Sequence, residues 1–184
     1  MILQLDLSGN QLMCGIDRYG EGTYTAEGVT AIAEALRTSV AGALTVTNLL
    51  GNQLDAESAK MLADVAKQKG FSLCGIRRDQ ATADFSTQNL KAPDAILLAS
   101  DLSQAVVTGA LTTLNLSSNE IGGHWDRSKQ QMVSTPEGPK AIADALLVNG
   151  GLTSIDLRNY NMNKEGEYWI HNAVRGKAGF QLRL

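Results

Sequence analysis

Apolar residues recur along the chain in a spacing that first has the period of a strand and then the period of a helix. The spacing leucine-x-x-leucine-x-leucine-x-x-asparagine-x-leucine fits four segments, 2–12, 44–54, 111–121 and 152–162, and a degraded copy covers 82–90. In the third segment Leu114 and Leu116 alternate with polar residues, as in a short strand with one buried face. The pattern therefore predicts five strands.

A helical pattern follows each strand segment, over 25–39, 55–70, 92–106, 135–150 and 163–176. Apolar residues recur there at intervals of three and four, as at Val29, Ile32 and Leu36, which predicts one buried stripe on each helix. Side chains suited to N-caps stand at Thr25, Asp55, Thr135 and Asn163. A single strand–helix unit cannot bury its own apolar face, so we expect the units to stack as a solenoid.

The geometry of such a stack predicts its shape. Parallel strands lie about 4.8 Å apart and packed helices about 8–10 Å apart, so the stack bends with its strands inside. We predict an α/β horseshoe with a parallel β-sheet on the concave side, α-helices on the convex side, and a closing C-terminal strand in "FQLRL". Three asparagines at strand ends are expected to form a ladder that satisfies backbone groups of the turns: Asn10, Asn52 and Asn119.

A longer repeat contains the short one. Leu5 matches Leu114, and Phe71 matches Phe180, both at a distance of 109 residues. We interpret the chain as one domain over 1–184, made of a block at 1–76, a joining repeat at 77–109 and a second block at 110–184. Each block carries an insertion between its first strand and first helix, at 13–24 and 122–133. Within 71–86 the pattern fits either one strand broken by a bulge or two adjacent strands.

The segments "LTTLNLSSNEIG" and "GPKAIADALLVNGGLTSIDL" resemble the leucine-rich repeats of the ribonuclease-inhibitor type, including those of protists and algae. The resemblance extends over essentially the whole chain. It implies a leucine-rich-repeat horseshoe of about five repeats that recognises proteins through its concave sheet and rims. It is specific for the fold and says almost nothing about the ligand.

The strand positions that alternate with the buried ones are the first candidate partner surface. They are Gln4, Asp6, Ser8, Asn48, Asp84, Ser86, Thr113, Asn115, Ser117, Ser154, Asp156 and Arg158, with Val46 and Leu50 in the second strand. Together they predict a mildly acidic groove that suits a basic or extended partner. The alternative is that small polar residues only keep a concave sheet soluble, because aromatic and arginine anchors are scarce there.

The insertions are the second candidate surface, since long loops on a rigid scaffold often carry function. The residues are Arg18, Tyr19, His124, Trp125 and Arg127. The alternative is a structural role, with Trp125 folded against its own loop.

Charge and composition argue against nucleic acid and membranes as partners. The net charge is −3, from 16 basic and 19 acidic residues, and no basic run could follow nucleic-acid or lipid phosphates. No apolar run reaches the roughly 20 residues of a membrane span, and no signal peptide begins the chain, so we expect a cytoplasmic protein without a membrane partner.

The two histidines lie on different elements and form no metal or nucleophile motif, which predicts no enzyme, metal or cofactor. We expect a protein–protein interaction module whose partner is unidentified. The alternatives are a regulator of a partner enzyme, inhibitor-like or GTPase-activating-like, and a structural fragment of a longer array. The strand at the N-terminal edge is a candidate surface for self-association.

Overall fold

Strands and helices alternate through the computed structural model, which describes residues 4–10, 14–16, 22–39, 44–126 and 129–184. Its helices are α1 (Glu27–Thr38), α2 (Ala56–Lys69), α3 (Ala92–Leu102), α4 (Ala105–Thr108), α5 (Glu137–Val148) and α6 (Lys164–Val174). Its parallel strands are β1 (Gln4–Asp6), β4 (Val46–Asn48), β5 (Thr82–Asp84), β6 (Thr113–Asn115), β9 (Ser154–Asp156) and β10 (Gln181–Arg183). The prediction of an α/β chain with parallel strands is confirmed.

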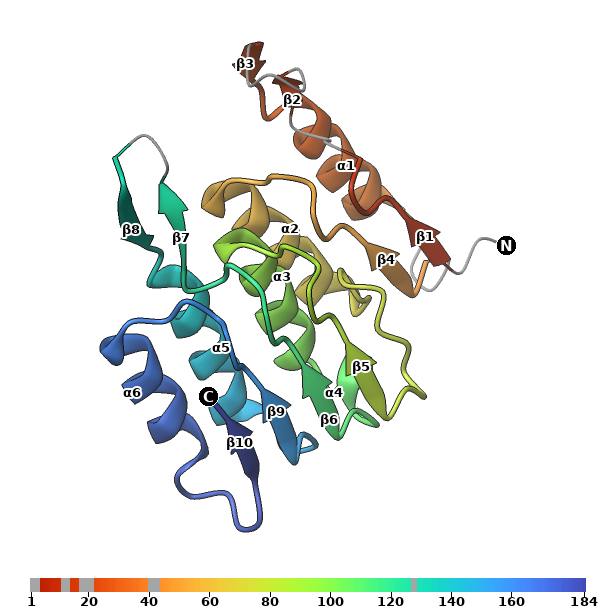
Figure 1. The fold of residues 1–184 in the computed structure, drawn as a ribbon. Coiled ribbons are helices and arrows are strands. Elements are labelled where there is room, and N and C mark those ends of the chain that lie inside the picture. The colour runs from red at the N-terminus through yellow and green to blue at the C-terminus, as the bar shows by residue number, and fades with distance from the viewer. Residues whose placement is uncertain (1–3, 11–13, 17–21, 40–43, 127–128) are drawn as a thin grey trace.

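The parallel strands follow one another in chain order in one layer, and the helices lie beside them in the same order (Figure 1). α1 packs on α2, α2 on α3, α3 on α5 and α5 on α6. Leu114 and Ile155 are fully buried and belong to the one core cluster that also contains Ile142 of α5. The alternation of the strands therefore places the leucines toward the helices and leaves the other strand face open.

The strands form two hydrogen-bonded parts where one sheet was predicted. β1 pairs with β4, while β5, β6, β9 and β10 form a four-stranded sheet. Between the two parts, Ser72 and Cys74 make isolated bridges to β4, and a turn follows in which the Gln80 N–H donates to the Arg77 carbonyl. Segment 71–86 therefore supplies two separate strand-like pieces, which settles the register that the sequence left open.

Both insertions contain antiparallel hairpins. β2 (Cys14–Ile16) pairs with β3 (Gly22–Tyr24), and β7 (Gly123–Asp126) pairs with β8 (Gln131–Ser134). Both hairpins stand at the upper end of the view in Figure 1. The order strand, hairpin, helix, strand, helix and strand-like segment thus occurs twice, ending once at 72–74 and once at β10.

Two of the four expected N-caps are present. The Asp55 side chain accepts the Ser58 N–H at 2.7 Å, and the Asn163 side chain accepts the Gly166 N–H at 2.9 Å. The other two predictions were wrong: Ala26 and not Thr25 occupies the N-cap of α1, and Pro136 and not Thr135 that of α5. The Thr135 hydroxyl instead donates to the Ile121 carbonyl at 3.0 Å and ties the helix start to the end of the preceding turn.

Two ladder asparagines have their side chains inside the stack. Asn119 is 2 % exposed; its amide donates to the carbonyls of Phe85 and Leu116, and its Oδ1 accepts the N–H groups of Gln88 and Leu90.

Asn52 is fully buried and joins the first two units, because its amide donates to the carbonyls of Leu7 and Leu49 and its Oδ1 accepts the Asn10 N–H. The Asn10 side chain is exposed and makes one bond of 3.3 Å to the Ser8 carbonyl. Tyr160, at the corresponding position of the last copy, is buried, and burial raises the pKa of its hydroxyl well above the usual value.

Candidate functional site

The open face of the four-stranded sheet forms a hollow of about 550 Å³. Side chains from all four strands line it, among them Thr82, Asp84, Thr113, Asn115, Thr153, Ser154, Asp156, Gln181 and Arg183. These residues line a face opposite to the buried leucines because strand residues alternate between the two faces. The hollow brings together the predicted outward residues Asp84, Thr113, Asn115, Ser154 and Asp156. Its other polar lining residues, which the sequence did not indicate, are Thr82, Thr153, Gln181 and Arg183.

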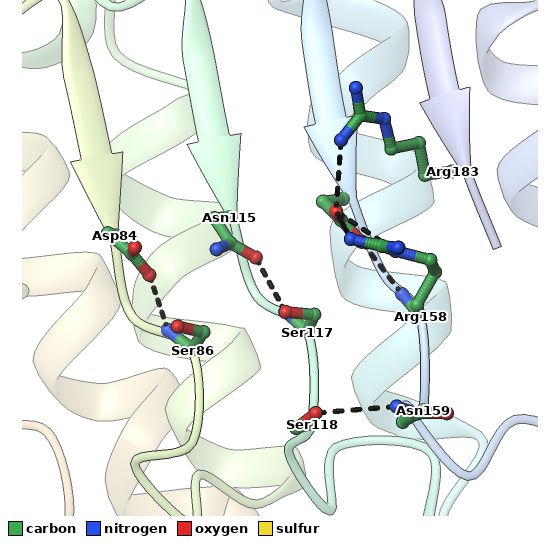
Figure 2. Close-up of polar contacts among 9 residues, drawn as sticks. Asp84, Ser86, Asn115, Ser117, Ser118, Arg158, Asn159 and Arg183 are labelled. Carbon is green, nitrogen blue, oxygen red and sulfur yellow. Dashed lines mark hydrogen bonds and ion pairs between the residues drawn. The ribbon is translucent and has the colours of Figure 1, made fainter.

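A column of aspartates and asparagines crosses this face at the strand ends, and each member closes its own turn. In every case Oδ1 accepts the backbone N–H two residues further on, over 2.9–3.2 Å, for Asp6, Asn48, Asp84, Asn115 and Asp156. Figure 2 shows this bond from Ser86 to Asp84 and the Ser117 contact to Asn115. The column therefore has a structural role as well as an outward position. The signal in the sequence is the repeated Asp/Asn-x-Ser, a composition typical of Asx turns.

The alternation of acid and amide in the column reduces repulsion between its carboxylates. Hydrogen bonds from Ser86, with a further one from Asn115, hold the pKa of Asp84 below its usual value, and Ser8 and Asn48 do the same for Asp6. Because Asn115 separates Asp84 from Asp156, these two carboxylates lie two strand spacings apart, about 10 Å. All of these carboxylates are therefore ionised at neutral pH.

Two arginines meet at Asp156, at the β9–β10 end of the hollow. Arg158 approaches its carboxylate side-on, with Nε 3.0 Å from Oδ1 and Nη2 2.7 Å from Oδ2. Nη1 of Arg183 lies 3.7 Å from the same Oδ2 (Figure 2). The hydrogen bond from Arg158 lowers the pKa of Asp156 despite its partial burial. Asp84 thus makes the β5 side of the open face acidic, and the paired arginines make the β9–β10 side basic.

The second strand does not contribute to an open groove as predicted. Val46 and Leu50 are buried, and Asn48 is half-buried. The segment after 72–74 turns over this strand, since the Gly75 N–H donates to the Thr47 carbonyl and Gly75 lies against the Asn48 side chain. Gly75 has φ +76°, a conformation that a side chain would strain. The first strand has three exposed residues, Gln4, Asp6 and Ser8. They are separated from the hollow by the second strand, so they do not line it.

The β7–β8 hairpin presents a second surface. Trp125 faces Met132 across the hairpin, and these side chains are 54 % and 46 % exposed. His124, which pairs with Val133 and is half-buried, points to the opposite face because neighbouring strand residues alternate. Trp125 is thus exposed to solvent and is not buried against its own loop. Three further predicted contact residues, Arg18, Tyr19 and Arg127, lie outside the residues that the structure describes.

Helix α3 holds two buried carboxylates that the sequence analysis missed. Asp94 accepts the N–H groups of Gly51 and Lys91, each at 2.8 Å. Asp101 is completely buried and accepts the Ser72 hydroxyl at 2.6 Å and the N–H groups of Leu73 and Cys74.

The two carboxylates join α3 to the preceding units and lie outside the hollow. Burial raises the pKa of both, and that of Asp101 reaches about 6, against the lowering effect of its donors. Burial and the nearby Asp101 likewise raise the pKa of the Cys74 thiol well above the usual value. Only Asp94 had a local signal, as the acidic N3 residue of a helix with proline in its first turn; Asp101 is recognisable only from contacts distant in sequence.

Comparisons with protein-family models and with curated proteins find no match for this chain. Among the described residues, His, Cys, Asp and Glu form no group of three placed to hold a metal ion. None of the helices in the described part of the chain has both the length and the apolar character needed to cross a membrane.

Proposed function

We propose that this chain is a leucine-rich-repeat protein of the ribonuclease-inhibitor type and that it acts as a protein–protein interaction module. Its strand–helix units would stack as a solenoid that bends into a horseshoe, because its strands are more closely spaced than its helices. Three observations support this: parallel strands with inward leucines, helices that pack on one another in chain order with the short α4 passed over, and buried asparagines that join successive turns.

The open hollow over β5, β6, β9 and β10 is the observation that carries the proposed function. It is broad, polar and lined by side chains from four strands, as a surface for an extended protein segment requires. Thr113, near its centre, is exposed and makes no turn-closing bond of the kind that its neighbour Asn115 makes. Side chains such as this one are available for a partner without cost to the fold.

We propose no catalysis by the chain itself. The groups whose pKa is raised most strongly are Asp101, Cys74 and Tyr160, and none of them lines the hollow. Perturbed titratable groups support an active site only where they meet in a cleft. Here the raised pKa values follow from burial inside the stack.

The proposal predicts that one substitution in the hollow strongly reduces the amount of partner captured. Wild-type protein, Thr113→Arg and Thr30→Arg are used as baits in a lysate of the source cell. Thr30 is an exposed residue of α1, so it receives the same change on the helical layer. We expect Thr113→Arg to lose at least about tenfold of the specific partner, because the longer charged side chain fills the hollow, and Thr30→Arg to retain it.

A third variant, Trp125→Ala, separates the two candidate surfaces. Equal capture by wild type and Thr113→Arg would contradict recognition through the sheet. Loss in Trp125→Ala alone would assign the contact to the hairpin. All variants are first compared by thermal unfolding, because a lost partner is informative only in a folded protein.

A further inference from the structure

The arginine pair at β9–β10 has more positive charge than its surroundings neutralise. Arg158 and Arg183 share the single carboxylate of Asp156 as their ion-pair partner among the described residues. Both arginine side chains remain more than half exposed. The three side chains of Arg158, Arg183 and Asp156 therefore carry one positive charge in excess, at the edge of a hollow that is open to a partner.

Both arginines also have hydrogen-bond donors to spare. A guanidinium has five N–H donors, and Arg158 directs only its Nε and Nη2 to Asp156. Arg183 approaches Asp156 only through Nη1, at 3.7 Å, which is longer than a hydrogen bond. Each planar group can thus donate to a second oxyanion while Asp156 holds the pair in place.

Hydroxyl groups adjoin the arginines. A second hollow of about 520 Å³ lies next to the first and is lined by Ser117, Ser118, Arg158, Asn159 and Leu184. Oγ of Ser118 accepts the Asn159 side-chain amide at 3.5 Å, so its own proton can point outward to a ligand (Figure 2). The Ser117 hydroxyl is already engaged with Asn115 at 2.8 Å.

We propose that Arg158 and Arg183, assisted by the Ser118 hydroxyl, bind the carboxylate of an aspartate or glutamate in an extended segment of the protein partner. This inference rests on the proposed function and names the chemistry of its ligand. A carboxylate matches the excess of one positive charge. A phosphate group carries about −1.5 to −2 at neutral pH and would leave uncompensated negative charge beside Asp156.

The acidic side of the hollow specifies a second feature of the same segment. Asp84 is ionised and lies about two strand spacings, roughly 10 Å, from Asp156. An extended chain covers that distance in about three residues. A segment with an acidic residue over the arginines therefore places a residue three positions away near Asp84, where a lysine or arginine is favoured.

The probe is the acetylated and amidated hexapeptide Ser-Glu-Gly-Ser-Lys-Ser, added to the isotope-labelled full chain while the arginine Nε–Hε signals are followed by NMR. We expect saturating shifts of the Arg158 and Arg183 signals. The matched peptide with glutamine in place of glutamate should bind about tenfold more weakly. Arg183→Gln should weaken binding about fivefold or more. Arg77→Gln should not change it, although Arg77 is as exposed and also faces a carboxylate, that of Asp79.

Three results would overturn the inference: no saturation at about 20 mM peptide, equal binding by Arg183→Gln and Arg77→Gln, or a phosphoserine peptide that binds about tenfold more tightly than the glutamate peptide. The readout needs no natural partner. Failure of the proposed function would appear as an absent partner in the capture experiment, and failure of this inference would appear as absent shifts at the two arginines. Unchanged backbone amide signals of β9 and β10 in Arg183→Gln will show that the sheet is intact.

Discussion

Replacing Asn119 with alanine is expected to lower the free energy of unfolding by about 4 kcal/mol. The substitution removes two accepted hydrogen bonds and three donated ones, the longest of them 3.5 Å, at a position that is only 2 % exposed. The N–H group of Leu90 and the carbonyl of Leu116 would remain buried without their partner, and each unsatisfied buried group costs about 1–3 kcal/mol. Chemical denaturation followed by circular dichroism measures the change.

Asn10→Ala is the matched control, because Asn10 occupies the same position in the first repeat but has an exposed side chain. To the residues that the structure describes, its side chain donates one bond, 3.3 Å long, which is worth about 0.5 kcal/mol at most. Similar losses for the two variants would show that the amide of Asn119 is not the element that joins the turns.

The second large effect is the pH dependence of the unfolding free energy that Asp101 causes. Its sign is opposite to that of a carboxyl group whose pKa is lowered by folding. In the folded protein the pKa of this carboxyl is raised from 3.8 to about 6, chiefly by burial. The folded state therefore binds the proton more tightly than the unfolded state, so the stabilisation is complete below about pH 4 and is lost as the pH rises through about 6. Compared with Asp101→Asn, which cannot titrate, wild type should lose about 3 kcal/mol of unfolding free energy between pH 4 and 7.

Relative to Asp84→Asn, the unfolding free energy of wild type should change with pH in the opposite direction. Hydrogen bonds from Ser86 lower the pKa of Asp84, so its ionised form stabilises the folded protein above the unfolded pKa and this contribution disappears as the pH falls. Urea unfolding of the three proteins at several pH values measures both trends. The unfolding free energy of wild type minus that of Asp101→Asn should fall as the pH rises from 4 to 7. If this difference stays constant or increases, the burial argument is wrong.

The strand and helix units were predictable because their signals are local. The alternation around Leu114 and Leu116 and the helical spacing of Val29, Ile32 and Leu36 lie within single elements. All five predicted helical ranges contain a helix within two residues of their expected starts, although 92–106 divides into α3 and the first residues of α4. Local periodicity reports the burial of one face of an element, and this is what the packing uses.

What was not predictable depends on contacts between distant residues. Asp101 receives its donors from residues 27–29 positions earlier, and no spacing rule links α3 to that segment. Val46 and Leu50 follow the outward alternation, yet both are buried, and Leu50 belongs to the core cluster. The charged site at Asp156 likewise needs Arg183 of the neighbouring strand, so Arg158 alone did not indicate it.

The most direct test of recognition through the open sheet is photo-crosslinking from single positions. Benzoylphenylalanine is introduced at position 113, in the hollow, and at position 30, on the helical layer, and each protein is irradiated in a lysate of the source cell. The proposed function predicts a specific crosslinked protein from position 113 that is absent from position 30. Crosslinking from position 30 with none from position 113 would contradict it and place the contact on the helices.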